Sequence, residues 1–146
     1  MNNYEPGSLL AFKWDNDSYG VCKVVKITET RKDPIINIIT YSNWFEGMPE
    51  NVDTAQLKPL VVHMPMLLPA MELSGSTPIG TAEVKPQELE GYENWLAAWQ
   101  DRRAGFFTRS IPDSIDEIME QMAIVDSPGD SMYKERLMQH WSKMRR

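Results

Sequence analysis

Two apolar runs separated by a short polar segment open the chain, at residues 9–14 and 21–27. Both runs are mainly apolar, the first with two aromatic residues and the second with β-branched residues, and the segment between them contains Asp15, Asp17 and Gly20. Aspartate side chains bond to nearby backbone groups and glycine accepts a positive φ, so the chain can reverse its direction here. The pattern therefore predicts an antiparallel β-hairpin made of these two runs.

Successive side chains of a strand point to opposite faces, which places Leu10, Phe12 and Trp14 on one face of the predicted strand. Three more stretches bounded by proline, glycine or polar turn residues extend the predicted sheet: residues 35–41, 57–66 and, after a Gly/Ser turn, the end of 71–84. About five short strands with turns between them are typical of a small, strongly curved antiparallel barrel or sheet. We therefore expect an SH3-like, β-rich part over residues 5–84.

The spacing of apolar residues becomes helical in residues 86–146. Three apolar stripes predict helices near residues 92–104, 114–124 and 128–144. Gly105 is expected to end the first helix, and Ser114 with Glu117 forms a capping box at the start of the second. Each stripe must bury its apolar face, and the sheet is the nearest apolar surface. The sequence thus predicts one α+β domain over residues 1–146, with the helices packed on the sheet.

Composition and charge narrow the class of partner. The chain of 146 residues is long enough for one core and has a net charge of -6, with most of the acidic excess in residues 1–90. An acidic surface repels nucleic-acid phosphates, so we expect no nucleic-acid partner and favour a basic protein. The N-terminus resembles no secretory signal, and the longest apolar stretch, residues 60–71, is too short to span a membrane. We therefore expect a cytoplasmic protein without membrane contact, in which Cys22 is a buried reduced thiol.

We find no motif for catalysis or metal binding in the sequence. Residues 15–20 begin like a calcium-binding loop, but Tyr19 and Lys26 stand where that loop needs an oxygen ligand and a bidentate glutamate. His63 and His140 have no second histidine or cysteine at the spacing of a metal site. We expect no catalytic residue, no metal and no cofactor. An enzyme is a third hypothesis, which clustering of either histidine with carboxylates in a pocket would favour.

One cluster, residues 102–109, mixes arginines with aromatic side chains. Such a cluster can bind nucleic acid, yet it is short and belongs to an acidic protein. We interpret it as the basic end of a helix that lies over two core phenylalanines, Phe106 and Phe107.

A loop expected after the third strand, residues 42–51, carries more apolar area than a loop needs. Either its aromatic residues fold back as a lid over the sheet, or they contact a partner, because aromatics among charged residues are typical of binding hot spots. The turn of the hairpin lies on the same rim or at the opposite end. We predict a partner-binding surface of these seven residues: Trp44, Phe45, Glu46, Met48 and Glu50 in the loop, with Asp15 and Asp17 in the turn.

The opening pattern also resembles a known family. Residues 6–12 (Pro-Gly-Ser-Leu-Leu-Ala-Phe) precede the acidic turn, and residues 19–25 (Tyr-Gly-Val-Cys-Lys-Val-Val) follow it. Together with residues 78–80 (Pro-Ile-Gly), this pattern resembles the bacterial polymorphic-toxin immunity proteins of the family numbered twenty-six. The likeness does not reach the helical tail. It implies a protein that neutralises a toxin by binding it, with no catalytic residues to carry over.

Two binding functions follow from these observations. We expect an immunity protein that binds and neutralises a protein partner, such as a basic toxin domain. The alternative is an SH3-like adaptor that recognises a peptide or a protein subunit through the same aromatic loop. An inhibitor holds one partner tightly, whereas an adaptor binds short peptides weakly. The sequence leaves the identity of the partner and the oligomeric state open.

Overall fold

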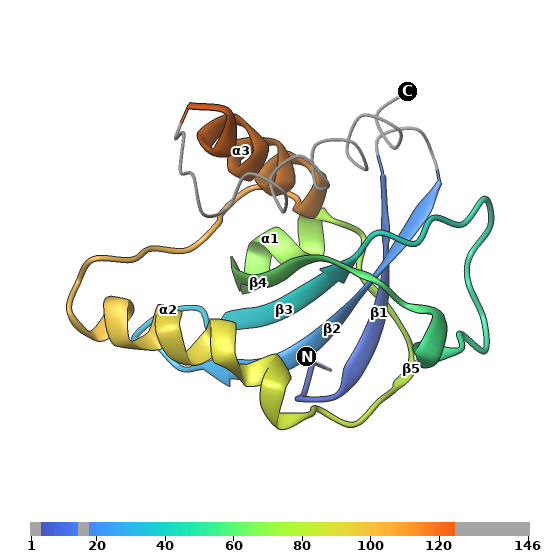
Figure 1. The fold of residues 1–146 in the computed structure, drawn as a ribbon, viewed down its shortest axis with the longest axis horizontal. Coiled ribbons are helices and arrows are strands. Elements are labelled where there is room, and N and C mark those ends of the chain that lie inside the picture. The colour runs from blue at the N-terminus through green and yellow to red at the C-terminus, as the bar shows by residue number, and fades with distance from the viewer. Residues whose placement is uncertain (1–3, 15–17, 125–146) are drawn as a thin grey trace.

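The computed structural model describes residues 4–14 and 18–124 (Figure 1). The predicted helix at residues 128–144 and the turn residues Asp15 and Asp17 lie outside the described residues.

A five-stranded antiparallel sheet forms the centre of the molecule, in the order β4-β3-β2-β1-β5. Its strands are β1 (Ser8–Lys13), β2 (Tyr19–Thr28), β3 (Ile35–Tyr41), β4 (Pro59–Leu67) and β5 (Thr77–Thr81). The antiparallel sheet and the α+β class predicted from the sequence are confirmed. Within the described residues β4 and β5 form the two edges of an open sheet, so the closed SH3-like barrel is not confirmed.

The predicted hairpin is present, but Gly20 has a different role from the one expected. Gly20 lies within β2 opposite Phe12, outside the positive-φ region, so it does not make the turn. A Cβ atom on Gly20 would lie 2.6 Å from Cζ of Phe12 and 2.7 Å from Nε1 of Trp14. Only glycine, which has no side chain, leaves room at this position of β2 for the rings of Phe12 and Trp14 to pack over the backbone.

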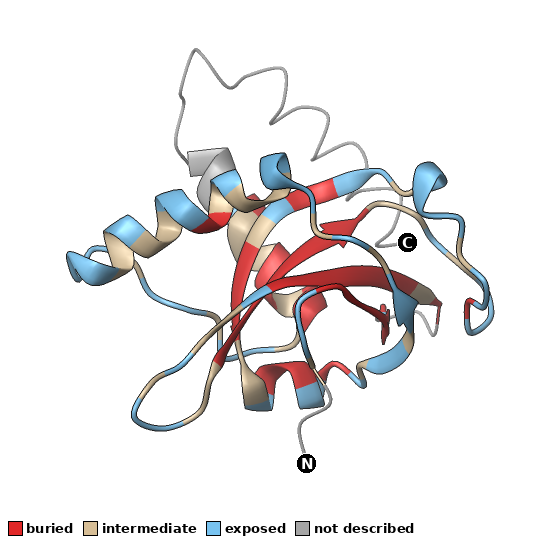
Figure 2. Ribbon diagram, turned by 90° about the horizontal axis from the view of Figure 1, so that it is seen from below, coloured by how far each residue is buried: buried red, intermediate tan, exposed pale blue. Residues whose placement is uncertain are grey.

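Two separate apolar clusters cover the two faces of the sheet. Leu10, Phe12 and Trp14 share one face, as predicted, where they meet helix α1 (Leu68–Leu73) and helix α3 (Ile111–Ile124). The other face has its own buried residues, among them Leu9, Val21, Val25, Ile39 and Tyr41, under half-buried side chains of residues 45–57 and 79–89. Figure 2 shows β1, β2 and β3 buried along most of their length, which requires apolar residues at successive positions on both faces, whereas β5 at the edge is mostly exposed.

Helix α2 (Glu90–Gln100) follows a short 3₁₀ turn, η2 (Pro86–Leu89), at the place where a first helix was predicted. It ends at Gln100, so the prediction that Gly105 ends it is wrong. Arg102 takes the left-handed conformation (φ 61), and the N–H of Arg103 bonds to the carbonyl of Ala98 at 2.7 Å. This closure is usually made by glycine, and an arginine in that role gives no signal in the sequence.

Helix α3 begins one turn earlier than predicted. The hydroxyl of Ser110 accepts a hydrogen bond from the N–H of Asp113 at 3.3 Å, which is the contact of an N-terminal cap. Ser114, the predicted cap, is buried inside the helix and donates to the carbonyl of Arg109. The short helix α1 was not predicted at all, because its six residues are too few to show a helical period.

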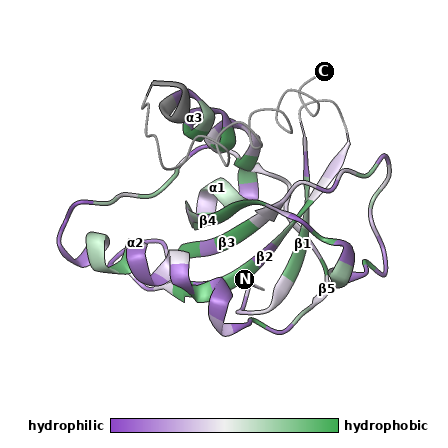
Figure 3. Cartoon of the chain, in the orientation of Figure 1, coloured by the Kyte–Doolittle hydropathy of each residue, from purple (hydrophilic) through white to green (hydrophobic). Residues whose placement is uncertain are grey.

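Figure 3 shows hydrophobic and hydrophilic residues side by side along α2, as its apolar stripe predicts. Only Tyr92 of this helix is buried, and Trp95, Leu96 and Trp99 are half-buried. Among the described residues, no helix has the length and apolar character that a membrane crossing needs.

Candidate functional site

The loop between β3 and β4, residues 42–58, lies at the far right of Figure 1. Phe45 pairs with Tyr19 of β2 through two backbone hydrogen bonds of 2.7 and 2.9 Å. The side chain of Asn43 bonds to the carbonyl of Gln56 at 2.9 Å and to the N–H of Lys58 at 2.8 Å. These bonds close the base of the loop, so its outer residues are held on a fixed frame.

The loop was expected either to cover the sheet as a lid or to contact a partner, and different residues of the loop fit each interpretation. Phe45 is half-buried and packs against the second face of the sheet, as the lid interpretation expects. Trp44 and Met48 point outward, with 49% and 43% of their surface exposed. Glu46 and Glu50 are exposed beside them. Four of the five predicted loop residues therefore form an accessible surface, and Phe45 anchors it.

These residues surround a shallow hollow of about 680 Å³. A short 3₁₀ turn, η1 (Thr54–Gln56), forms one wall, and the carboxylate of Asp53 caps it by accepting from the N–H of Ala55 at 3.0 Å. Asp53 is exposed and adds a third carboxylate to those of Glu46 and Glu50. We call residues 43–53 the acidic–aromatic loop. Apolar area ringed by negative charge is chemistry suited to a basic protein surface.

The predicted turn residues Asp15 and Asp17 lie outside the described residues. Tyr19, which comes shortly after them, pairs directly with Phe45 at the base of the acidic–aromatic loop. The described end of the hairpin therefore reaches the loop.

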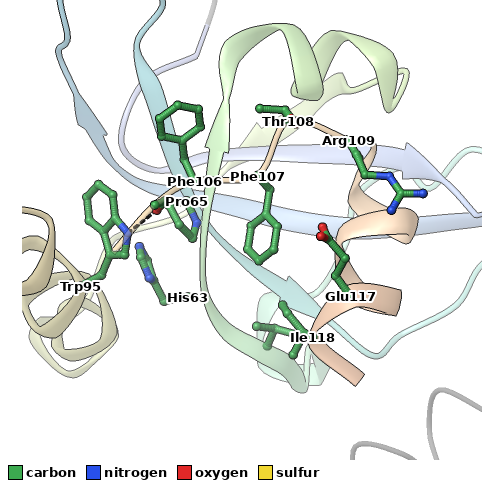
Figure 4. A pocket seen from close by; sticks show the side chains of 11 residues that line it. His63, Pro65, Trp95, Phe106, Phe107, Thr108, Arg109, Glu117 and Ile118 are labelled. Atoms are coloured by element: carbon green, nitrogen blue, oxygen red, sulfur yellow. Dashed lines mark hydrogen bonds between the residues drawn. The ribbon is translucent and has the colours of Figure 1, made fainter. Parts of the chain in front are cut away.

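A second concave region lies over the edge of β4, between α2 and α3 (Figure 4). It encloses about 570 Å³. His63 and Trp95 line one side, and Phe107, Glu117 and Ile118 line the other. We call it the β4 cleft. Nothing in the sequence indicates a pocket around His63, because the helices that form its walls are distant in sequence.

His63 is held as a neutral ring in this cleft. Its Nε2–H donates to Oδ1 of the buried Asn37 at 2.9 Å, and its ring lies 5.5 Å from that of Trp95. Burial lowers the pKa of His63 to about 4, so the ring carries no charge at neutral pH. The partner amide carries no charge that would raise this pKa. His63 is thus suited to support α2 rather than to accept a proton from a substrate.

Cys22 is also fixed as an uncharged group. It is fully buried in the first apolar cluster, as predicted, and burial raises the pKa of its thiol far above the usual value. A thiolate is therefore disfavoured at this position. Within the described part of the chain, no three histidine, cysteine or acidic side chains gather as metal ligands would.

Lys23 is a buried charge that the sequence did not single out, because it lies in an apolar strand pattern. Its Nζ bonds to Oε1 of Glu88 at 2.7 Å and to the carbonyl of Glu83 at 3.1 Å. Burial, and then the charge of Glu88, raise the pKa of Tyr41 nearby. The ion pair ties the segment before α2 to the second face of the sheet, so we assign it a structural role.

No family model matches the chain, and neither a curated protein nor a solved structure matches it.

Proposed function

We propose that the protein is an immunity-type inhibitor that binds a basic toxin domain in the cytoplasm through the acidic–aromatic loop. The observation that carries this proposal is the exposure of Trp44 and Met48 beside Glu46 and Glu50 on a loop closed by hydrogen bonds at its base. The resemblance of residues 6–25 and 78–80 to the immunity family supports it.

The loop has the two properties that such an inhibitor needs. A tryptophan and a methionine exposed together supply apolar area that a partner can bury, and tryptophan is enriched among hot-spot residues. The loop base is fixed by the Asn43 bonds and the Phe45 bridge, so less conformational entropy is lost on binding. The exposed carboxylates attract a basic partner over a distance and speed the encounter.

Inhibition of this kind involves no chemistry on the partner. The thiol of Cys22 is uncharged at neutral pH, so it is not ready for nucleophilic attack. His63 is neutral, but its pKa of about 4 makes it a weak base and its Nε2–H is bonded to Asn37, so it is poorly suited to proton transfer. We therefore propose a protein that acts by binding alone.

The decisive experiment isolates the partner and then tests the loop. The full chain is used to capture its partner from the native cytosol, and the binding kinetics of Trp44→Ala are compared with those of Leu73→Ala. Leu73 is a matched control because 70% of its surface is exposed on α1, away from the loop. We expect Trp44→Ala to speed dissociation by about thirtyfold, which corresponds to a hot-spot loss of about 2 kcal/mol.

The captured partner must also be toxic to cells, and wild-type chain must relieve that toxicity better than Trp44→Ala does. Equal dissociation rates for Trp44→Ala and Leu73→Ala would contradict the proposed surface. A partner without toxicity would contradict the immunity function.

The hollow beside Trp44 favours a second candidate, an adaptor with an SH3-like barrel that takes one apolar side chain of a short peptide. The stoichiometry and strength of binding separate the two functions. An immunity protein forms a tight one-to-one complex with a folded domain, whereas an adaptor binds several short peptides in the micromolar range or weaker.

A further inference from the structure

A surface of opposite character lies at the other end of the molecule, at the left of Figure 1 where α2 ends. Phe106, which was expected in the core, has 39% of its surface exposed. Its ring meets Trp99 edge-to-face at 5.8 Å, and Trp99 stacks on Trp95 at 5.4 Å. The interpretation of the arginine-rich cluster as a cover over two core phenylalanines is therefore wrong for Phe106.

Phe106 forms a ridge between two hollows. One is the β4 cleft of about 570 Å³, and the other is a smaller hollow of about 290 Å³ lined by Leu67, Trp99 and the turn between β2 and β3. Figure 4 shows the rings of Phe106 and Phe107 pointing in different directions from neighbouring positions. Each hollow has the size and the apolar walls to receive one side chain of a partner.

Cations surround this aromatic ridge in a protein that is acidic as a whole. Five basic side chains line the two hollows or the bend between α2 and Phe106, and all five are exposed: Arg31, Lys32, Arg102, Arg103 and Arg109. Three acids lie among them: Asp33, Asp101 and Glu117. The local charge is therefore positive, although the net charge of the chain is -6. We call these residues with Trp95, Trp99 and Phe106 the basic–aromatic surface.

The bend that carries Phe106 is held in one conformation. The indole N–H of Trp95 donates to the carbonyl of Gly105 at 2.8 Å, and Phe107 forms two backbone hydrogen bonds with β4, of 2.8 and 3.0 Å. A ridge fixed on both sides can receive a partner without first being ordered.

We propose that the basic–aromatic surface binds an acidic protein segment that carries two apolar side chains, one for each hollow beside Phe106. The positive charge of the surface favours a negatively charged partner, and each of the two hollows can take one apolar side chain of that partner. Single-stranded nucleic acid is the less suitable occupant. It needs a row of cations along its backbone, whereas three carboxylates interrupt this patch and the whole chain repels phosphates.

This surface is distinct from the acidic–aromatic loop, which lies at the opposite end of the long axis in Figure 1. The two proposals can therefore fail independently.

The test is an NMR titration of the full-length, ¹⁵N-labelled chain with the capped peptide Asp-Glu-Leu-Asp-Phe-Glu-Asp. Two further probes are the same peptide with serine for its leucine and phenylalanine, and an oligothymidylate of equal charge. We expect the acidic peptide to shift the Trp99 indole and Phe106 amide signals, with an affinity that falls as salt is raised. The serine peptide should bind about tenfold more weakly.

Two substitutions locate the binding energy. Phe106→Ala should weaken the peptide about tenfold, since it removes the ridge between the hollows. Lys32→Glu should weaken it severalfold, whereas Lys58→Glu, the same change beside the acidic–aromatic loop, should alter affinity by less than about twofold. The comparison of Lys32→Glu with Lys58→Glu still tests the proposal if Phe106→Ala fails to fold.

Three outcomes would overturn the proposal. The first is tighter binding of oligothymidylate than of the peptide. The second is an equal effect of Lys32→Glu and Lys58→Glu. The third is the absence of shifts at millimolar peptide, as expected if another part of the chain or a second copy already covers this surface.

Discussion

At the scale of single residues, Gly20 is the position where packing leaves least freedom. A Cβ atom there would lie 2.6 Å from the Phe12 ring and 2.7 Å from the Trp14 indole nitrogen, and both of these residues are buried. We expect Gly20→Ala to lower the free energy of unfolding by about 1–3 kcal/mol, because the two rings must leave their rotamers.

Gly47→Ala is the matched control for this change. No atom lies within 4 Å of a Cβ built on Gly47, and its φ is not positive. Urea denaturation should show Gly47→Ala unchanged or slightly stabilised, by at most about 1 kcal/mol. Equal midpoints for the two variants would mean that the rings adapt freely to a methyl group.

His63 makes stability depend on pH. Burial lowers its pKa from 6.5 in the unfolded chain to about 4 in the folded one, so only the unfolded chain takes up this proton between these values. The stabilisation from His63 is present above pH 6.5 and is lost as the pH falls to about 4. The loss amounts to about 3 kcal/mol.

His63→Gln removes this titration and keeps a side chain that can donate to Asn37. Urea denaturation of both proteins from pH 7 to 4 should therefore give curves that converge as the pH falls. Parallel curves would show that His63 titrates in the folded protein as it does in the unfolded chain.

At the scale of elements, the start of α3 depends on Ser110. Its hydroxyl accepts from the N–H of Asp113 at 3.3 Å, one of the helix N–H groups that lack a partner in the helix itself. Ser110→Ala should lower the free energy of unfolding by about 1 kcal/mol. Thr108→Ala, an exposed change before the helix, should have little effect. A larger loss of stability in Thr108→Ala than in Ser110→Ala would show that Ser110 is not the cap of α3.

The strands were easier to predict than the helix ends, for a physical reason. The apolar run of residues 9–14 and the β-branched runs that follow extend over many positions, so several residues indicate each strand. The start of α3 depends on one serine of two, Ser110 and Ser114, and both are followed three positions later by an acid. The burial of both Ile111 and Ile115 in the cluster on the first face, which the sequence does not show, decides between them.

At the scale of the whole molecule, the two interaction surfaces that we propose lie at opposite ends of the long axis in Figure 1. The acidic–aromatic loop was predictable, because Trp44, Glu46, Met48 and Glu50 are neighbours in sequence. The basic–aromatic surface brings together residues from the β2–β3 turn, α2 and the segment before α3. The sequence shows only the arginine-rich cluster of this surface, residues 102–109. No pattern in the sequence places Arg31 and Lys32 beside Phe106.

The charge of the acidic–aromatic loop gives the last prediction. Glu46→Lys with Glu50→Lys reverses two exposed charges without changing the apolar contacts of Trp44 and Met48. The double variant should therefore associate with a basic partner about tenfold more slowly at low salt, with a smaller change in dissociation. Screening shortens the reach of the field, so the difference should fade at high salt.

The control carries the same change of net charge on other elements: Glu72→Lys on α1 with Glu120→Lys on α3, both exposed. Stopped-flow association at two ionic strengths distinguishes a local effect of the loop from an effect of net charge. If both double variants slow association equally, steering comes from the charge of the whole protein. If neither does, the loop is a structural cover over the second face of the sheet, and the partner binds elsewhere.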